Sequence, residues 1–326
     1  MEMTNITNSR AIDISVIICT YNRCESLKQT LNSLFAQKDI NQFTYEIIVV
    51  DNNSKDNTKE VAESYKQHFN GRLQYMFEPR QGKSYALNSA ITKARGEILA
   101  FTDDDAIVDS HWISSIIEVF QRTGCMAIAG KIIPVYPSEL PRWIVQEGPH
   151  SASLDGIFCF FDRGNEEREC RGIEDLPYGA NMAFRKIAFE KYGLFKTTLG
   201  RNKKLTTGED IEFAYRLFKN KERMVYAPNI IVNHMVDEKR LRKDYFRKWY
   251  FYSGLSHAQI APDLERFEYW FGVPRYLLRQ LVSNSVAWLS WILRFNGRIA
   301  FSKELKIRRI LGQMCGYRKL GTVKNV

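Results

Sequence analysis

Short apolar runs alternate with helix-like patterns through the first third of this 326-residue chain. The runs are rich in Ile, Val, Leu and Phe, as buried strands are, and they lie at 14–19, 46–50, 73–77 and 98–102. Between them, apolar residues recur at helical spacing through Leu27, Leu31 and Leu34, from 58 to 68, and through Tyr85, Leu87 and Ile91. Strands that alternate with helices predict a sheet with crossover helices on its faces. We therefore expect an α/β fold whose first half is Rossmann-like.

Polar clusters follow three of these predicted strands at the point where each strand ends. Thr20, Asn22 and Arg23 follow the first strand, Asp51 follows the second, and an acidic run at 103–105 follows the fourth. In open α/β sheets, ligands bind in the crevice outside the carboxyl ends of the strands. The sequence therefore predicts one binding site to which these distant segments contribute.

The acidic run consists of Asp103, Asp104 and Asp105. Three adjacent carboxylates repel one another, so a cation is needed to keep them ionised. Oxygen ligands of this kind suit Mg²⁺ or Mn²⁺ bridging a diphosphate, with one carboxylate on the metal and another reaching a ribose. The alternative is a solvated acidic turn that caps the helix expected near Trp112.

Two further segments have the residue types of a nucleotide site. Asp51 could accept hydrogen bonds from a nucleobase or ribose, although the residues of DNNS also make turns and helix caps. Gly82 and Lys83 precede a predicted helix, where a backbone amide and an ammonium can meet a phosphate. The spacing is not that of a P-loop, and Ser84 as an ordinary N-cap is the simpler alternative.

A second acidic pair, Glu209 and Asp210, opens a helix expected to run to Lys219. Acids in a first helical turn ordinarily compensate the helix dipole. A helix start beside the sheet crevice can equally hold a general base, for which Asp210 is the first choice and Glu209 the second. His234 follows an apolar run and either completes a metal shell through a ring nitrogen or is an ordinary structural histidine.

The pattern changes along the rest of the chain. Residues 126–183 contain several prolines and read as loops around short strands, and residues 223–226 read as a closing strand. After His234 the chain becomes rich in Arg, Lys and aromatic residues at helical spacing. We therefore expect a catalytic sheet domain at residues 1–235 and a helical extension at residues 236–326.

The basic charge lies in this extension. The net charge is +10, and residues 237–326 hold 18 Lys and Arg against 7 Asp and Glu. A basic, aromatic helical segment fits an anionic membrane surface. The ordinary alternative is a solvated surface, with the apolar side chains packed on the sheet domain: Leu281, Trp288, Leu289 and Ile292. Nucleic acid is the weakest alternative, because the extension resembles none of the common nucleic-acid-binding modules.

Several features bear on the cellular compartment. Six scattered cysteines without a CxxC pair favour reduced thiols. The first 15 residues lack the basic and apolar regions of a signal peptide. The apolar stretch 280–293 is 14 residues long, short of the roughly 20 that span a bilayer. We expect a cytoplasmic protein that is at most peripheral at the inner face of a membrane.

Six segments, read in order, resemble the motif series of the family 2 glycosyltransferases, which have the GT-A fold. They span about residues 13–235 and read SVIICTYNR, EIIVVDNNSKDNT, RQGKSYALN, ILAFTDDDA, PYGANMAF and GEDIEFAYRLF. An ordered series of six is far more specific than any one of its members. The resemblance implies a GT-A mixed sheet flanked by helices, with the C-terminal helical extension appended.

The resemblance assigns roles on the donor side by position. The polar residues after the first strand would lie near the nucleotide, and Asp51 would contact its base or ribose. Asp103 and Asp105 would form the metal and diphosphate site, with His234 as a further metal contact. One departure is Leu87, where many relatives have an arginine, so Lys83 or Arg80 would take its place.

The resemblance also implies a reaction. Asp210 would remove a proton from an acceptor hydroxyl as its oxygen attacks the anomeric carbon, so the configuration inverts. The donor-sugar and acceptor side would be lined by Gly179, Ala180 and Asn181.

We expect a hexosyltransferase that uses a nucleotide-sugar, a UDP-sugar being favoured, together with Mn²⁺ or Mg²⁺. Its acceptor would be a glycan or lipid-linked glycan in lipid-linked oligosaccharide or surface polysaccharide synthesis. One alternative is a sugar nucleotidyltransferase, which would release pyrophosphate. Another is a catalytically inactive relative that binds sugar or lipid.

Overall fold

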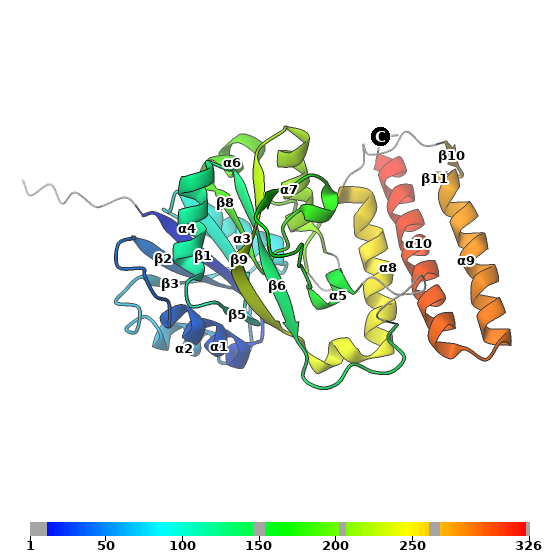
Figure 1. The fold of residues 1–326 in the computed structure, drawn as a ribbon, viewed down its shortest axis with the longest axis horizontal. Helices are drawn as coiled ribbons and strands as arrows, with labels where there is room; N and C mark the ends of the chain where they lie inside the picture. Colours follow the sequence, from blue (N-terminus) through cyan, green and yellow to red (C-terminus); the bar gives the residue numbers. More distant parts are fainter. Residues whose placement is uncertain (1–11, 146–153, 202–206, 261–267, 324–326) are drawn as a thin grey trace, which may run out of the picture.

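The computed structural model describes residues 12–145, 154–201, 207–260 and 268–323. In these residues one nine-stranded sheet forms in the order β3-β2-β1-β4-β8-β6-β9-β5, with β7 beside β9 (Figure 1). Its strands are β1 Ile14–Thr20, β2 Tyr45–Asp51, β3 Leu73–Phe77, β4 Ile98–Asp103, β5 Ala106–Val108, β6 Ala127–Val135, β7 Arg168–Glu169, β8 Met182–Arg185 and β9 Met224–Met235.

The helices that accompany this sheet lie on both of its faces or in its loops. They are α1 Cys24–Phe35, α2 Thr58–Ser64, α3 Lys83–Lys93, α4 Trp112–Thr123, α5 Asp155–Phe158, the 3₁₀ helix η1 Ile173–Asp175, α6 Lys186–Tyr192 and α7 Glu209–Lys219.

The four strands expected in the first half pair with one another in parallel. β1 lies between β2 and β4, and Ile14 pairs with both Tyr45 and Ile98. Every residue of β2 is buried. Strands covered on both faces read as continuous apolar runs, which explains why β1 and β2 lack an alternating pattern. The expected α/β sheet with flanking helices is confirmed.

Three elements differ from their expected bounds. The helix expected at 58–68 ends at Ser64. After it, the backbone hydrogen bonds span three residues instead of four, as in a 3₁₀ helix: Tyr65 N–H donates to Ala62 O at 3.3 Å. β6 is a nine-residue strand in a segment expected to be loops around short strands. β9 continues past the expected residues 223–226 and includes His234.

Two apolar cores fill the layers on the opposite faces of the sheet. One face packs against α1, α2 and α4 through residues such as Leu31, Ala62 and Trp112. The other face packs against α3, α6 and α7 and includes Leu87 and Phe213. All six cysteines are free, so apolar packing rather than disulfides holds these layers together.

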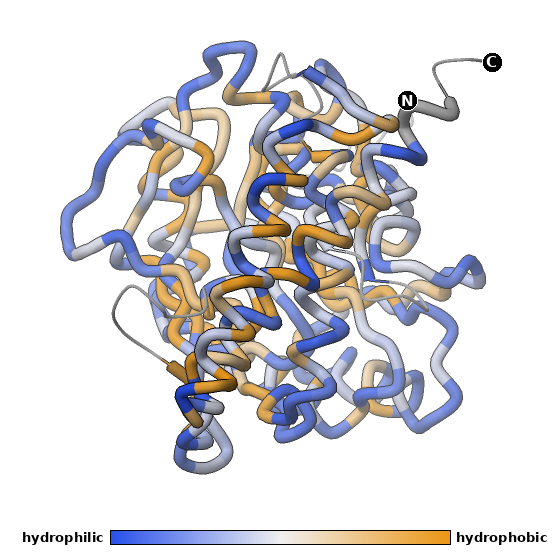
Figure 2. The backbone as a smooth tube through the Cα atoms, turned by 90° about the vertical axis from the view of Figure 1, so that its right-hand side faces the viewer, coloured by the Kyte–Doolittle hydropathy of each residue, from blue (hydrophilic) through white to orange (hydrophobic). Residues whose placement is uncertain are grey.

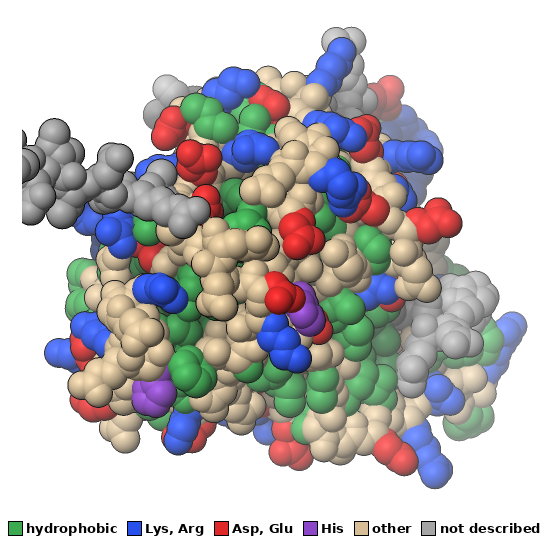
Figure 3. Space-filling view, turned by 60° about the vertical axis from the view of Figure 1, so that its left-hand side comes forward, with side chains coloured by type: hydrophobic (Ala, Val, Ile, Leu, Met, Phe, Trp, Pro, Cys, Tyr) green, Lys and Arg blue, Asp and Glu red, His purple; other side chains and the backbone are tan. Residues whose placement is uncertain are grey.

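Charge on the sheet domain is mixed. Figure 3 shows acidic and basic side chains interspersed over the face of the molecule that it draws. The first 236 residues contain 29 Lys and Arg against 30 Asp and Glu, so they are close to neutral. The basic surplus therefore belongs to the segment that follows.

Three long helices follow the sheet, and they lie side by side in the order α8, α10, α9 outward from it (Figure 1). Their bounds, with those of the short elements between them, are η2 Glu238–Leu241, α8 Lys243–Ile260, β10 Tyr269–Trp270, β11 Val273–Pro274, α9 Arg275–Leu293 and α10 Gly297–Val323. Figure 2 faces this side and shows hydrophobic and hydrophilic residues alternating along the helices. Among the described residues, none of the helices has both the length and the hydropathy to cross a membrane.

Glycines allow α8 and α10 to touch backbone to backbone. A Cβ atom built on Gly312 of α10 would lie 2.0 Å from Phe251 O, and one on Gly254 of α8 would lie 2.1 Å from Arg309 O. A Cβ on Gly316 would lie 2.7 Å from a backbone oxygen of α8. No side chain fits at these points, so the position of α10 against α8 depends on all three glycines.

The variant Gly312→Ala should therefore destabilise the protein. The added methyl would force the two helices apart, and overpacking of this kind costs about 1–3 kcal/mol. Urea unfolding measures the change. The matched control is Gly297→Ala, at the start of the same helix, where an added Cβ meets nothing within 4 Å. Equal free energies of unfolding for the two variants would contradict the close contact.

Candidate active site

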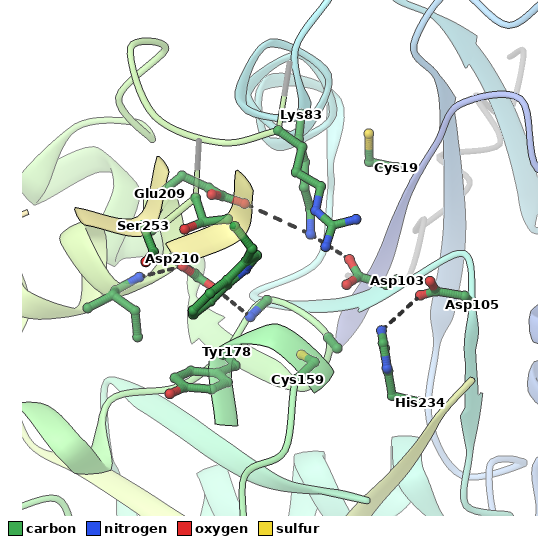
Figure 4. A pocket seen from close by; sticks show the side chains of 18 of the residues that line it. Cys19, Lys83, Asp103, Asp105, Cys159, Tyr178, Glu209, Asp210, His234 and Ser253 are labelled. Carbon is green, nitrogen blue, oxygen red and sulfur yellow. Dashed lines mark hydrogen bonds and ion pairs between the residues drawn. The ribbon is translucent and has the colours of Figure 1, made fainter. Parts of the chain in front are cut away.

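A cavity of about 820 Å³ lies at the carboxyl ends of β1 and β4. One wall comes from the sheet and another from the start of α7 (Figure 4). A third wall comes from α8 and α10. The wall contains the following residues expected from the sequence: Thr20, Arg23, Lys83, Asp103, Asp104, Asp105, Gly179, Ala180, Glu209, Asp210 and His234. The strand-end clusters thus converge on one place.

The acidic run provides one end of this cavity. Asp103, Asp105 and His234 each offer a donor atom, and these atoms lie within 4.8 Å of one another. His234 reaches the cluster because β5 pairs antiparallel with β9, which sets Ala106 opposite His234. The ring Nε2 lies 3.3 Å from Asp105 Oδ1, as Figure 4 shows.

These three residues fit a divalent cation. Carboxylate oxygens suit Mg²⁺ and Mn²⁺, and an imidazole nitrogen can complete the set. His234 is not held as an ordinary core histidine, because its buried Nδ1 has no hydrogen-bond partner among the described residues. The alternative of a solvated acidic turn does not hold, since Asp104 and Asp105 are each 6% exposed.

Cationic side chains surround the same carboxylates. Arg23 contacts both Asp105 and Asp104, the latter at 3.1 Å, and Arg240 lies 3.4 Å from Asp105 Oδ2. Lys83 Nζ lies 2.5 Å from Asp103 Oδ1. These ion pairs balance a group of negative charges that burial would otherwise make unfavourable.

The pKa values of the three aspartates separate as a result. Burial opposes ionisation of Asp103 and Asp105, yet Lys83 lowers the pKa of Asp103, and His234 with Arg23 holds that of Asp105 well below its ordinary value. Burial raises the pKa of Asp104 to about 6, despite the opposing charge of Arg23. Asp103 and Asp105 are therefore the ionised pair, as a cation site requires.

The start of α7 provides the opposite side of the cavity. Gly208 has a φ of 96°, a left-handed value that turns the chain sharply into the helix. Asp210 Oδ2 accepts a hydrogen bond from Gly179 N–H at 2.7 Å, and Oδ1 accepts one from Ile211 N–H at 2.8 Å. Two backbone donors therefore fix the direction of this carboxylate.

Lys83 lies between the two acidic groups. Its Nζ is 3.9 Å from Glu209 Oε1, and a Cβ atom on Gly179 would lie 3.2 Å from both Lys83 Nζ and Asp210 Oδ2. Burial raises the pKa of Glu209 to about 7, helped by the charge of Asp210, and burial also raises that of Asp210. Raised pKa values make these carboxylates stronger bases than exposed ones.

Comparison with known proteins decides the family. Residues 15–193, more than half of the chain, match the model of glycosyl transferase family 2. The chain belongs to this family. One relative is the succinoglycan biosynthesis protein ExoM of Rhizobium meliloti, 26% identical over 78% of this chain and 77% of that protein. Another is a glucosyl-dolichyl phosphate glucuronosyltransferase of Haloferax volcanii, 26% identical over 74% of this chain and 75% of that protein.

Solved structures agree on the fold of this glycosyltransferase. The mannosyltransferase PcManGT of Pyrobaculum calidifontis, in complex with GDP-Man and Mn²⁺, superposes with a TM-score of 0.60. The two sequences are 17% identical, and the superposition covers 97% of this chain and 88% of PcManGT. S. aureus TarS 1-349 in complex with UDP gives a TM-score of 0.53 at 17% identity, covering 91% and 90%. The GT-A fold implied by the motif series is confirmed.

Four residues expected in the site of this glycosyltransferase are not in the cavity wall. Asn22 Oδ1 accepts from Lys55 N–H on the surface, and Gly82 N–H donates to Asn52 Oδ1 at 2.7 Å, so this amide is already bound. The other two, Asp51 and Asn181, are buried. The motif places all four near the cavity, yet their polar groups serve the scaffold here.

The hydrogen bonds of the buried pair explain their position. Asp51 accepts from Tyr75 O–H and Ser54 N–H, both at 2.8 Å. Asn181 donates to Ile230 O at 2.8 Å and accepts from Trp112 Nε1–H at 2.9 Å. Their roles in donor and acceptor binding stay predictions. Of the two proposed substitutes for the missing arginine at Leu87, Lys83 lines the cavity, whereas Arg80 pairs with Glu78 outside it.

The cavity also contains residues that the sequence did not point to. Arg201 approaches from a loop and Arg240 from η2, and α8 and α10 add a polar and aromatic wall with Trp249, Ser253, His257 and Arg309. These residues lie outside the six motifs and show no spacing that links them to the acidic run. Only the three-dimensional packing of the last helices identifies them.

Glu209→Gln should stabilise the protein in a pH-dependent way. The pKa of Glu209 is about 7 in the fold against an ordinary 4.5, so this residue favours folding below pH 4.5 and loses that advantage as pH rises to 7. The variant avoids the loss, so at pH 8 it should gain on the order of 3 kcal/mol, since each pKa unit is worth about 1.4 kcal/mol.

Urea unfolding at pH 5 and pH 8 in metal-free buffer measures this effect. Glu118→Gln, at an exposed position of α4, is the control. The change that it causes in the free energy of unfolding should be the same at the two pH values. A gain for Glu209→Gln that is equal at both pH values would mean that ionisation of the buried carboxyl is not its cause.

Proposed function

We propose that this protein is an inverting glycosyltransferase that moves a sugar from a nucleotide-diphosphate sugar to an acceptor hydroxyl. The observation that carries the proposal is the pair of groups on opposite sides of one cavity. Asp103 and Asp105, with His234, form a cation-binding group on the sheet, and Asp210 lies across from them with its direction fixed. A diphosphate at the first group and a hydroxyl at Asp210 would lie on either side of a donor sugar.

Asp103, Asp105 and His234 would hold Mn²⁺ or Mg²⁺. When bound, the cation would offset the negative charge that builds on the departing nucleoside diphosphate. A complex of PcManGT contains GDP-Man and Mn²⁺, and a complex of GalNAc-T7 contains UDP, GalNAc and Mn²⁺, which supports a metal of this kind. TarS is in complex with UDP and PcManGT with GDP-Man, so UDP is a preference and the nucleotide varies among relatives.

Cationic side chains would bind the diphosphate directly. Arg23 and Lys83 neutralise the acidic run in the free enzyme and can turn to phosphate oxygens. Arg201 forms no ion pair with a described residue, and its Nη2 lies 3.5 Å from Tyr245 O–H. An arginine without a carboxylate partner beside a diphosphate site can bind phosphate without first breaking an ion pair.

Asp210 would act as the general base. Its Oδ atoms accept hydrogen bonds from two backbone N–H groups and retain lone pairs for the acceptor hydroxyl. As it takes the proton, the acceptor oxygen attacks the anomeric carbon and the bond to the diphosphate breaks. A single displacement of this kind inverts the configuration.

The relatives support a glycan acceptor. One is named for succinoglycan biosynthesis, and another for transfer to a glucosyl-dolichyl phosphate. Surface polysaccharide or lipid-linked oligosaccharide synthesis is therefore the setting we propose. A sugar nucleotidyltransferase would release pyrophosphate instead, and an inactive relative would release nothing, so the products distinguish the three.

We also propose that α9 lies on an anionic membrane surface. Val282, Val286, Leu289 and Leu293 form a stripe along its outer side, with exposures of 65%, 65%, 53% and 70%. Residues 273–303 contain five Arg and Lys and no Asp or Glu. A second copy of the chain would set these like charges against each other, whereas anionic lipid complements both the charge and the apolar stripe.

The catalytic assignment predicts that Asp210→Asn and Asp105→Ala each lower kcat by on the order of 10² or more, since general-base assistance is worth about 10² to 10⁴. The assay is a panel of nucleotide-sugars with Mn²⁺ or Mg²⁺, scored for nucleoside diphosphate release. Glu118→Gln is the control and should leave kcat unchanged. If Asp210→Asn were near normal and Glu209→Gln inactive, the base would be Glu209, and pyrophosphate as product would overturn the proposed reaction.

The membrane proposal predicts that the protein floats with vesicles of mixed neutral and anionic lipid, and that salt weakens this binding. Val286→Glu should lower binding about tenfold or more, because the charge enters the apolar stripe. Ile187→Glu, at another exposed apolar position, is the control and should bind normally. Salt-independent failure to bind, or a dimer that Val286→Glu disrupts, would overturn the proposal.

A further inference from the structure

Helices α8 and α10 complete the cavity with a wall that the donor site does not use. Trp249, Ser253 and His257 recur every four residues along α8, so they lie on one side of that helix, and all three line the cavity. In Figure 4, Ser253 lies beside Glu209 and Asp210, on the opposite side of Lys83 from Asp105 and His234. This wall therefore flanks the proposed base rather than the diphosphate site.

Arg309 adds a positive charge to this wall. Its backbone lies against α8 because Gly254 has no side chain, and the residue lines the cavity. No described residue forms an ion pair or hydrogen bond with its guanidinium. The neighbouring arginines are engaged, since Arg308 and Arg247 both bind Glu304, at 2.9 Å and 2.7 Å. Among the described residues, Arg309 is thus a cation without an ion-pair partner beside the cavity.

His257 and Ser253 supply polar groups beside this cation. Burial, together with the charge of Arg309, lowers the pKa of His257 to about 4, so the ring is neutral near pH 7. A neutral imidazole offers one N–H donor, and Ser253 Oγ, whose proton now goes to Tyr250 O at 3.1 Å, can reorient. A guanidinium that has two neutral polar groups beside it, and no ion pair to a carboxylate of a described residue, is complementary to an anion.

We propose that Arg309, His257 and Ser253 form a subsite for an anionic group of the acceptor, a phosphate or a sugar carboxylate. The assignment to the acceptor rests on the proposed function, because it places the transferred sugar between the acidic run and Asp210. Arg23, Lys83 and Arg201 remain for the donor diphosphate. The acceptor would then be a charged glycan or lipid-linked glycan, held by its anion while its hydroxyl lies at the base.

Inorganic phosphate tests the subsite without any turnover. NMR of the histidine rings in metal-free protein follows two positions at once, because His257 reports the α8 wall and His234 reports the acidic end. Phosphate should shift the His257 resonances and raise its pKa, because an anion favours the imidazolium. Glucuronate serves as the carboxylate probe, and the tighter of the two anions identifies the acceptor class.

Arg309→Gln should weaken the anion binding seen at His257 about tenfold or more, because a charge-assisted contact is lost. The Arg309→Gln substitution should leave the His234 resonances almost unchanged. Arg309→Lys should retain part of the binding, which separates loss of charge from misfolding. Arg308→Gln is the matched control, since it removes the neighbouring arginine that pairs with Glu304, and it should bind as the unaltered protein does.

The outcomes separate this inference from the proposed function. Phosphate and glucuronate that leave His257 unshifted, or shift it equally in Arg309→Gln, would overturn the subsite even if nucleotide-sugar turnover is normal. Absence of turnover with every nucleotide-sugar would overturn the proposed function, while anion binding at Arg309 would still be measured by the histidine signals.

Discussion

The cavity depends on the ammonium of Lys83. Two groups of carboxylates lie in one partly buried cavity, and burying such charges is costly unless each has a partner of opposite charge. Lys83 contacts Asp103 at 2.5 Å and lies 3.9 Å from Glu209, so one cation serves both groups. Burial disfavours its charged form, yet Asp103 and Glu209 raise its pKa above the ordinary value. The acidic run and the proposed base are therefore electrostatically linked.

The fold is most predictable where the sequence of a single strand or helix is enough to identify it. β1 to β4 are apolar runs bounded by polar clusters, and the helices between them have regular spacing, so local pattern and final structure agree. β6 is longer than the short strands expected there, because Lys131 and Pro134 interrupt its apolar run and its place in the sheet comes from pairing with β8 and β9. Pairing between distant strands has no local signature, which is why the second half of the sheet was harder to predict.

The same division applies to the site. Strand-end position was enough to predict that Arg23 and the acidic run would meet, because the carboxyl ends of neighbouring parallel strands share one edge. Asn181 belongs to a family motif, yet its amide joins β6, β9 and α4 through hydrogen bonds in the core. Arg309 carried no signal, because its approach depends on a glycine 55 positions earlier in the chain. A family motif therefore predicts which residues lie near the cavity, and packing determines which of their atoms face it.

The glycine contact between α8 and α10 has a consequence for the order in which the protein is made. A ribosome synthesises the sheet, the acidic run and Asp210 well before Gly312, so all the donor-side residues emerge first. The last wall of the cavity can close only when α10 has left the exit tunnel and docked on α8. A chain interrupted before Arg309 would lack the α10 part of this wall, so the side of the cavity beside the proposed base would open to water.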